Sequence, residues 1–404
     1  MVIVPHPLSS LTSDETVALA TTAFDDVVSA ITAGHGSLSS SGTGSRPAAL
    51  KRIDDDFVIT DPVTDEAQAS GLLYELGFTD GLPVFVPTPD RVDALLRAWP
   101  PEKRPARPPL IQPRRGLATP SAMAANAVMT GLPPALMPYL AATLEAAAHP
   151  DFKLFNLQTT TNPVTPVVVV GGPNARAMGF NDGLGSIGGG NIANATLGRA
   201  LKLCMRNLGG GRAADGTDPA TMGQPGKYAF CFAENEDFTS WPRLREQTRR
   251  TSFSDFDDAV TVVGVTGTMN MIIKSTSAEE LLQMIARSIR SIGSNDYMFG
   301  GNPLLVLCPE QAEILVRESV SLTAIQEALF DLTKIVFSAF APKNQEMMRT
   351  PRFDDLGTLH PDTEIPMVKE PADILVCVTG GPSMHSTFMP SFGGSEPVSS
   401  RVRL

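Results

Sequence analysis

Cysteine, histidine and the larger aromatic residues are scarce in this chain of 404 residues, which has four cysteines, five histidines, two tryptophans and four tyrosines. No two cysteines are closer than 27 positions, so no C-x-x-C pair exists, and no histidines have metal-ligand spacing. This pattern argues against a disulfide framework and against a zinc site of the usual Cys/His type. Single cysteines in apolar stretches are typical of reduced, buried thiols in the cytoplasm.

Long apolar runs and an excess of basic residues are also missing. No stretch approaches the roughly 18 consecutive apolar residues of a membrane span, and the opening MVIVPHPLSS lacks the basic and apolar regions of a secretory signal. The formal net charge is -11, which disfavours a nucleic-acid groove because such grooves depend on clustered Lys and Arg. We therefore expect a cytoplasmic protein that binds neither membranes nor nucleic acid.

The remaining composition is that of a globular protein, with 42% hydrophobic and 19% charged residues. Segment 32–47, TAGHGSLSSSGTGSRP, is rich in Gly and Ser and predicts a flexible linker behind a short N-terminal helix. We expect this helical extension and its linker over residues 1–50. A helix-rich region with one short strand should follow over 51–160, and an α/β core over 161–404.

Four apolar runs predict the strands of that core, at 165–172, 259–267, 303–308 and 373–381. Because the runs are continuous rather than alternating, they suit strands buried on both faces. Three of them lead into helical patterns, which is typical of parallel β-α-β units. We predict an α/β fold with a mostly parallel sheet, Gly-rich strand-to-helix loops and added alanine-rich helices. The similar strand ends VVVVGGPNA and VCVTGGPSM are compatible with two related halves or with chance.

A glycine-rich loop, NDGLGSIGGGNIANATLGRAL at 181–201, contains G-x-G-x-x-G over 183–188 directly before a helical pattern. A dinucleotide fingerprint needs a strand immediately before it and an acidic residue about 20 positions later. The nearest predicted strand ends too early, and no Asp or Glu occurs between Asp182 and Asp215. A Walker A motif also fails, since glycines occupy 189–190 where Lys and Ser or Thr are needed. The chain thus carries no NAD or ATP signature.

The second half of this loop predicts an anion-binding site. Gly188, Gly189 and Gly190 lead into Asn191, a candidate N-cap, and then a helix with apolar positions at 3.6 periodicity. Unpaired N–H groups at such a helix start attract carboxylate or phosphate. The alternative is a glycine hinge that only reverses the chain. Three basic residues of the helix are expected to form a solvated or ion-paired stripe: Arg199, Lys202 and Arg206.

The densest group of reactive residue types lies within 207–241, where the predicted strand KYAFCFAE ends in Glu234, Asn235, Glu236 and Asp237. Glu234 and Glu236 could serve as general acid and base, or as oxygen ligands of Mg²⁺. A charged strand end facing water is the alternative. Cys231 could be a nucleophile if a nearby cation or helix N-terminus lowered the pKa of its thiol, although buried cysteines are usually inert.

Four further residues are candidates for the same site. His385 follows a predicted strand end and a Gly-Gly turn, where an imidazole could do acid/base chemistry, unless it is a surface-loop histidine. Asp80, in FTDGLP, most simply caps a turn and is otherwise a candidate substrate contact. Lys227 and Arg212 could supply positive charge to an anionic substrate.

Five stretches together have the length of a family signature: ELGFTDGLPVFVPTPDRV, AANAVMTGLPP, GGGNIANATLGRAL, MGQPGKYAFCFAENE and GGPSMHSTFMPSFGG. They resemble bacterial proteins with a UGSC-like (seleno)protein domain, over roughly residues 66–400. The resemblance implies redox work for members that carry a U/C-G-S-C motif, and this chain departs from the pattern because it has no C-G-S-C. It favours the glycine-rich loop and the GQPGKY…CFAENE block as the place of the site.

The residues favour an enzyme that acts on a small anionic metabolite by acid/base chemistry, as a lyase or hydrolase. The anion would lie at 188–191, and Glu234 or Glu236 would act as the base. Cys231 or His385 would act as nucleophile or acid. Two alternatives stay open: a cysteine-dependent oxidoreductase or reductase subunit, and a non-catalytic binding or assembly subunit. The cofactor is left unassigned, and alanine-rich helices beside glycine loops would suit a homo-oligomer.

Overall fold

The computed structural model describes residues 14–15, 17–18, 20–21, 24, 50–53, 56–59, 65–213, 216–238, 240–248, 257–348 and 356–404. The chain divides into two compact units, residues 1–62 and residues 63–404. In the first unit, β1 (Leu50–Ile53) and β2 (Asp56–Ile59) pair as an antiparallel hairpin. The predicted linker at 32–47, and most of the helix predicted before it, lie outside the described residues.

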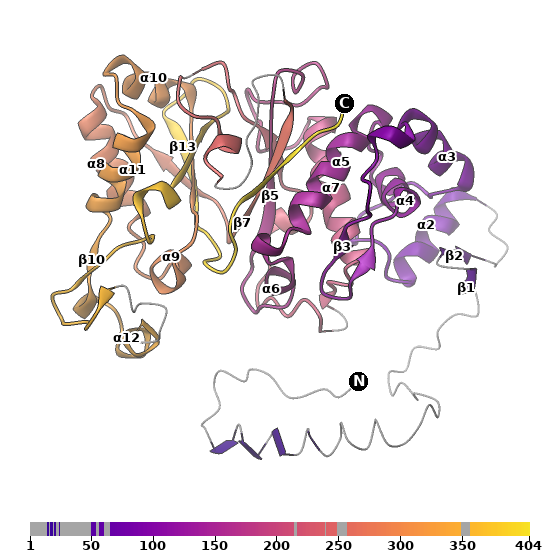
Figure 1. The fold of residues 1–404 in the computed structure, drawn as a ribbon, viewed down its shortest axis with the longest axis horizontal. Helices are drawn as coiled ribbons and strands as arrows, with labels where there is room; N and C mark the ends of the chain where they lie inside the picture. The colour runs from indigo at the N-terminus through magenta and orange to yellow at the C-terminus, as the bar shows by residue number, and fades with distance from the viewer. Residues whose placement is uncertain are drawn as a thin grey trace. The chain divides into compact units, whose positions relative to one another are not determined.

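The second unit contains two four-stranded sheets that pack face to face (Figure 1). The first sheet has the order β14 (Val398–Arg401), β7 (Ala259–Val265), β5 (Thr165–Gly171), β6 (Cys231–Ala233). The second has the order β8 (Met269–Ile272), β13 (His385–Met389), β9 (Leu304–Leu307), β12 (Leu375–Val378).

Helices cover the outer face of each sheet (Figure 1). The first sheet is covered by α4 (Pro120–Thr130), α5 (Met137–Ala147) and α7 (Ile192–Asn207), with α2 (Glu66–Glu75) and α3 (Pro89–Ala98) farther out. The second is covered by α8 (Ala278–Ile289), α10 (Pro309–Arg317) and α11 (Leu322–Leu332). The result is a helix–sheet–sheet–helix sandwich in which α3, α4, α5 and α7 share one hydrophobic core with β5, β6 and β7.

The continuous apolar runs are explained by this layering. In β5, Val167 and Val169 face the second sheet, whereas Val168 and Val170 face the helices, and all four are buried. Successive side chains of a strand point to opposite faces, so a strand between a sheet and a helix layer needs apolar residues at every position.

The α/β class is confirmed, but the expectation of a mostly parallel sheet is wrong. Only β5–β6 and β9–β12 pair in parallel within the two large sheets described here, and the other four neighbouring pairs are antiparallel. The physical reason is that an uninterrupted apolar run reports burial of both faces and carries no information on strand direction.

The two sheets belong to an internal repeat that exchanges its last strand. In the first half, α5, the short α6 (Leu154–Gln158), β5, α7, β6 and β7 follow one another. In the second half, α8, the short α9 (Asn295–Phe299), β9, α10 and α11, β12 and β13 follow in the same order. The strand after β7 is β8, which joins the second sheet, and the strand after β13 is β14, which joins the first.

Strand directions support the repeat. In each sheet, one edge strand pairs in parallel with its neighbour, and the remaining two pairs of neighbouring strands are antiparallel. β5 therefore corresponds to β9 and β6 to β12. The two halves share this strand order, but VVVVGGPNA and VCVTGGPSM end non-equivalent strands, β5 and β12.

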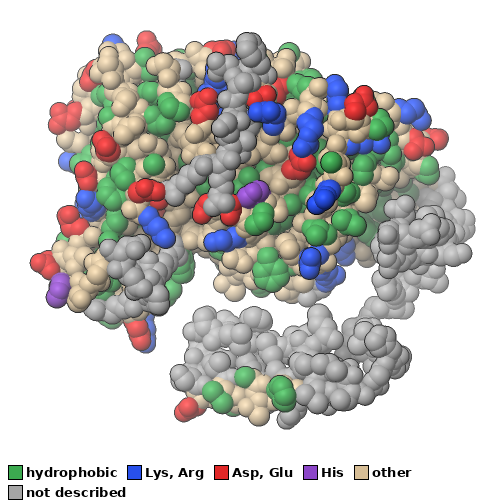
Figure 2. Space-filling view, viewed as in Figure 1, with side chains coloured by type: hydrophobic (Ala, Val, Ile, Leu, Met, Phe, Trp, Pro, Cys, Tyr) green, Lys and Arg blue, Asp and Glu red, His purple; other side chains and the backbone are tan. Residues whose placement is uncertain are grey.

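The smaller elements lie at the margins of this sandwich. They are the hairpin β3 (Leu110–Ile111) with β4 (Gly116–Leu117), the pair β10 (Ile335–Val336) with β11 (Glu364–Ile365), and α12 (Pro342–Met348). On the face drawn in Figure 2, basic side chains lie among acidic and hydrophobic ones. None of the helices in the described part of the chain combines the length and the apolar character needed to cross a membrane.

Candidate functional site

The carboxyl ends of β6 and β12, which are edge strands of the two sheets, meet at one place. Thr379 Oγ1 donates to the carbonyl of Ala233 at 2.7 Å and to that of Asp182 at 3.1 Å. The backbone N–H of Asn235 donates to the carbonyl of Val378 at 2.7 Å. Ligands of α/β folds commonly bind beyond the carboxyl ends of strands. This junction between the two halves therefore has the position that ligand sites commonly have in α/β folds.

Glu234 directly follows β6 and is almost fully buried, with 9% of its surface exposed. Like Phe232 two positions earlier, it belongs to the strand face that looks toward the second sheet. Both of its carboxylate oxygens accept from the backbone N–H of Leu244, at 3.1 and 3.0 Å. Burial, together with the nearby charge of Glu236, raises the pKa of Glu234 to about 8. The Glu234 carboxyl is therefore mostly protonated at neutral pH.

Glu236 has the opposite surroundings, because it lies between two arginines. Arg245 Nη1 donates to Glu236 Oε1, and Arg243 Nε is 3.3 Å from Oε2. Burial raises the pKa of Glu236, while the two guanidinium groups oppose that increase. The Arg245 side chain is only 2% exposed, and its Nε and Nη2 donate to no group of the described residues.

The Gly-Gly turn after β5 packs directly against carboxylates. A Cβ on Gly171 would lie 2.3 Å from Glu236 Oε1, and one on Gly172 would lie 2.3 Å from Asp258 Oδ1. Gly172 also has a φ of +120°, which side chains rarely allow. Asp258 in turn accepts from the hydroxyl of Tyr139 at 2.8 Å. Glycine is therefore needed here so that the backbone can approach these two acids.

A single 3₁₀ turn, Leu244–Glu246, organises the arginine side of the site. It presents the N–H that Glu234 accepts and the guanidinium that Glu236 accepts. Gln247, the next residue, fixes this turn to β12, since its Nε2 donates to the carbonyl of Val376 at 2.7 Å and its Oε1 accepts from the N–H of Val376 at 3.0 Å.

Glu234 and Glu236 line one small cavity of about 10 Å³, together with Trp241, Arg243 and Cys377. This volume is room for about one water molecule. A mostly neutral carboxyl and a carboxylate held by cations thus face the same space, which suits one as a proton donor and the other as a proton acceptor. Within the described ranges, no group of three or more His, Cys, Asp and Glu side chains could hold a metal ion. The carboxylates that Mg²⁺ would need as ligands here have oxygens that already accept from Leu244, Arg243 and Arg245.

No protein-family model, curated protein or solved structure matches this chain. The likeness to UGSC-like proteins stays a prediction from the sequence.

The glycine-rich loop reaches the same end of the first sheet. Asn191 is the N-cap of α7, as predicted, and its side chain accepts from the N–H of Asn194 at 2.9 Å. Asn181 donates from its backbone to the Asn194 side chain at 3.0 Å and accepts from the N–H of Ala233 at 3.2 Å. The predicted anion-binding residues 188–191 are thereby tied to the end of β6, with the three glycines exposed.

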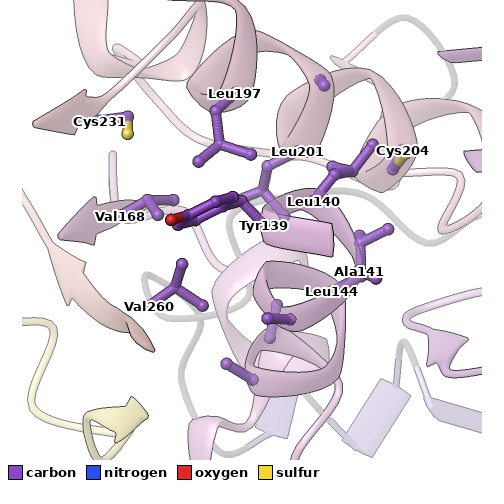
Figure 3. Close-up of a cluster of buried hydrophobic side chains, with 14 of the residues drawn as sticks. Tyr139, Leu140, Ala141, Leu144, Val168, Leu197, Leu201, Cys204, Cys231 and Val260 are labelled. Atoms are coloured by element: carbon purple, nitrogen blue, oxygen red, sulfur yellow. The ribbon is translucent and has the colours of Figure 1, made fainter. Parts of the chain in front are cut away.

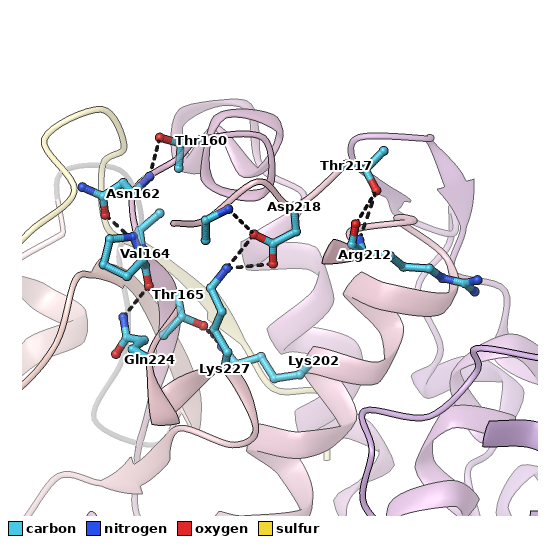
Figure 4. Close-up of polar contacts among 12 residues, drawn as sticks. Thr160, Asn162, Val164, Thr165, Lys202, Arg212, Thr217, Asp218, Gln224 and Lys227 are labelled. Carbon is cyan, nitrogen blue, oxygen red and sulfur yellow. Dashed lines mark hydrogen bonds and ion pairs between the residues drawn. The ribbon is translucent and has the colours of Figure 1, made fainter. Parts of the chain in front are cut away.

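Lys227 and Arg212 lie toward the opposite end of the first sheet (Figure 4). Lys227 precedes β6 and pairs with Asp218 at 2.7 Å, and Arg212 follows the C-terminal end of α7. The 16 residues of α7 span about 24 Å at 1.5 Å per residue. The charge that these two residues were expected to supply therefore lies far from Glu234, whose neighbouring cations are Arg243 and Arg245.

Asp80 makes a bidentate ion pair with Arg199 on α7, with both N–O distances at 2.8 Å and both side chains mostly buried. The arginine holds the pKa of the Asp80 carboxyl below its ordinary value against the desolvation that would raise it. The pair fixes the FTDGLP turn to α7, so Asp80 has a structural role here beyond capping its own turn.

Cys231 faces the helices, on the opposite side of β6 from Glu234, within the core formed by α5, α7 and β5 (Figure 3). All four cysteines are free and buried, as expected from their surroundings in the sequence. Burial raises the pKa of Cys231, Cys204 and Cys377. A nucleophilic cysteine acts as the thiolate, so this burial disfavours the nucleophile and redox roles considered for Cys231.

His385 is exposed at the start of β13, where it pairs with Ile272 of β8. The loop that leads to His385 begins at Thr379, beyond the carboxyl end of β12, and it contacts the glycine-rich loop where Leu184 packs on Gly381. His385 thus belongs to the same end of the molecule as Glu234, but it does not line the cavity of the two glutamates.

Sequence reasoning missed Arg243, Arg245, Gln247 and Lys202. The first three stand in WPRLREQ, where no local pattern marks a partner 129 positions away such as Val376. Lys202, assigned to a basic stripe, is instead buried, and its Nζ donates to Thr165 Oγ1 at 2.8 Å (Figure 4). Burial and the nearby Lys227 hold the pKa of Lys202 well below its ordinary value. On α7, Lys202 lies four positions after Gly198 and three before Met205, and these small and apolar neighbours on its face were the available signal.

Proposed function

We propose that this protein is an enzyme that acts on a small anionic metabolite by acid/base chemistry, as a hydrolase or lyase, with Glu234 and Glu236 as its proton-transfer pair. The observation that carries the proposal is the asymmetry of two glutamates that line the same cavity. Among the described residues, Glu234 accepts hydrogen bonds from a backbone N–H alone, whereas Glu236 is held by both arginines. Pairs of titratable groups with such different surroundings are typical of acid and base assignments.

In this proposal Glu234 is the general acid. Its carboxyl keeps a proton at neutral pH because burial raises its pKa to about 8. A group with a pKa near the working pH is well suited to donate a proton in the transition state and to recover it afterwards. Glu236, which the arginines favour in its charged form, takes the complementary role and accepts a proton from a water in the cavity or from the substrate.

Arg243 supports an anionic substrate. Its side chain is 29% exposed while it contacts Glu236, and it lines the cavity, so it can meet a ligand at the cavity mouth. The cavity holds only about one water, so the body of a substrate would lie outside it, toward the exposed glycines at 188–190. The helix start behind those glycines is the proposed site for a second anionic group.

Turnover is the direct test. We expect Glu234→Gln and Glu236→Gln each to reduce turnover at least about a hundredfold, the usual contribution of general acid/base catalysis. Both side chains keep their shape and an acceptor oxygen after substitution. A panel of phosphate esters, carboxylate esters and hydroxy acids would be incubated with each protein, and products would be followed by mass spectrometry.

The matched control is Glu313→Gln, which removes the same charge from the exposed side of α10 and should leave turnover unchanged. Circular dichroism would establish that each variant is folded. Full turnover by folded Glu234→Gln and Glu236→Gln proteins would remove the pair from the mechanism.

A further inference from the structure

A second and larger cavity lies at the amino-terminal side of β9 and β12, away from the strand ends that carry Glu234. Its volume is about 350 Å³, within the range of small-molecule sites. Residues from both halves of the repeat border it: Lys153 before α6, Gln247 after the 3₁₀ turn, Asn302 before β9, Lys369 before β12, and the crossover 393–397 between β13 and β14.

Bare backbone makes up part of the wall, where two Phe-Gly-Gly segments, 299–301 and 392–394, pack on each other. A Cβ on Gly301 would lie 2.8 Å from the Cα of Gly393, and one on Gly393 would lie 2.4 Å from the carbonyl oxygen of Gly300. Both glycines also have positive φ. No larger residue fits this approach, so the cavity keeps a wall of backbone groups that a ligand can contact directly.

The polar groups around the cavity divide by whether they already have partners. The carboxylates of Asp373 and Glu370 each accept from the backbone N–H of the other residue, and Asp373 also accepts from Asn302 Nδ2 at 3.2 Å. The Nζ groups of Lys153 and Lys369 have no hydrogen-bond or ion-pair partner among the described residues. In the same part of the chain, the backbone N–H groups of Gly301, Gly394 and Ser395 donate to no other group.

Two of the groups that lack partners are thus cations, and three are backbone N–H donors. A ligand that satisfies them must bring acceptor oxygens and negative charge. We propose that this cavity binds a small organic anion, carrying a carboxylate or a phosphate group, through Lys153, Lys369 and the neighbouring backbone N–H groups. The site is separate from the two glutamates, because the two cavities have no lining residue in common.

Calorimetric titration of the full chain tests the proposal, with inorganic phosphate and malonate as separate probes at constant, low ionic strength. We expect at least one probe to bind with a dissociation constant below about 1 mM. Lys369→Gln and Lys153→Asn should each weaken binding by about tenfold, because each removes a charge-assisted hydrogen bond. Asn is chosen at 153 because that residue has a φ of +51°, which Asn tolerates.

Lys343→Gln is the matched control, since Lys343 is 91% exposed and pairs only with Glu346; its affinity should equal that of the original protein. Binding of malonate alone would assign a carboxylate ligand, and binding of phosphate alone a phosphate ligand. The proposal is overturned if neither probe binds, or if Lys343→Gln weakens binding as much as the cavity variants do. The Glu234→Gln variant should bind the probes in this cavity with unchanged affinity. A negative binding result and a negative turnover result can therefore be told apart.

Discussion

Replacing Arg245 by methionine is expected to lower the free energy of unfolding by about 3 to 5 kcal/mol, the cost of breaking a buried ion pair by removing one partner. The Arg245 side chain is 2% exposed and that of Glu236 is 11% exposed. Without the guanidinium, Glu236 keeps Arg243 at 3.3 Å and a backbone hydrogen bond from Gly172. The adjoining cavity of about 10 Å³ has room for about one water molecule, which can replace a hydrogen bond but not the positive charge. Urea unfolding at pH 7 would measure the change.

The natural comparison is Arg91→Met, which breaks a pair of similar geometry on the surface. Arg91 Nη1 lies 2.6 Å from Glu66 Oε1, with the two side chains 42% and 50% exposed. Exposed pairs contribute little to stability because water screens their charges, so this variant should lose far less stability than Arg245→Met. The double variant Arg245→Met with Glu236→Gln should recover much of the loss, because it leaves no charge unpaired. Equal losses for the Arg245 and Arg91 variants would show that burial does not govern the Arg245 pair.

The sequence predicted the class of the fold and the positions of its main strands, because both depend on local signals. The run TPVVVV must be buried on two faces wherever it lies, and Thr88 and Pro89 are the N-cap and first-turn residues that start α3. Strand direction is different in kind. Whether β7 runs parallel or antiparallel to β5 depends on a connection that can cross between sheets, and the exchange of β8 and β14 has no signature in composition or periodicity.

The candidate site divides in the same way. Glu234 and Glu236 were found because they stand at the end of an apolar strand, where an ionisable side chain is unusual. Their partners come from WPRLREQ and from the Gly-Gly turn after β5, and only the folded chain brings these segments together. Lys227 was misplaced for the same reason. It is seven positions from Glu234 in the sequence, but the strand between them carries it to the other end of the sheet.

Raising the pH is expected to destabilise the protein through Glu234, and Glu234→Gln should remove that loss. The pKa of Glu234 rises from an ordinary 4.5 to about 8 on folding. Between these values the folded chain holds the proton more tightly than the unfolded chain does, so stability falls as the pH rises from about 4.5 through about 8 and is level above that. The difference between the two pKa values corresponds to about 5 kcal/mol.

Glutamine cannot titrate, yet it keeps an oxygen that accepts from the N–H of Leu244. The variant and the original protein should therefore have similar free energies of unfolding at pH 5, and the variant should be more stable by several kcal/mol at pH 9. The charges of Glu236 and Glu246 also act on Glu234, and the charge of Glu234 acts on Cys377. Asp296, whose pKa burial raises to about 6, adds a slope at lower pH that both proteins share.

The difference between the urea-unfolding profiles of the original protein and Glu234→Gln isolates the effect of Glu234, and Glu313→Gln supplies the baseline for loss of one exposed carboxylate. A variant that loses stability toward pH 9 as steeply as the original protein would mean that Glu234 is already ionised at neutral pH, and Glu234 would then lack the proton that the proposed general acid must donate.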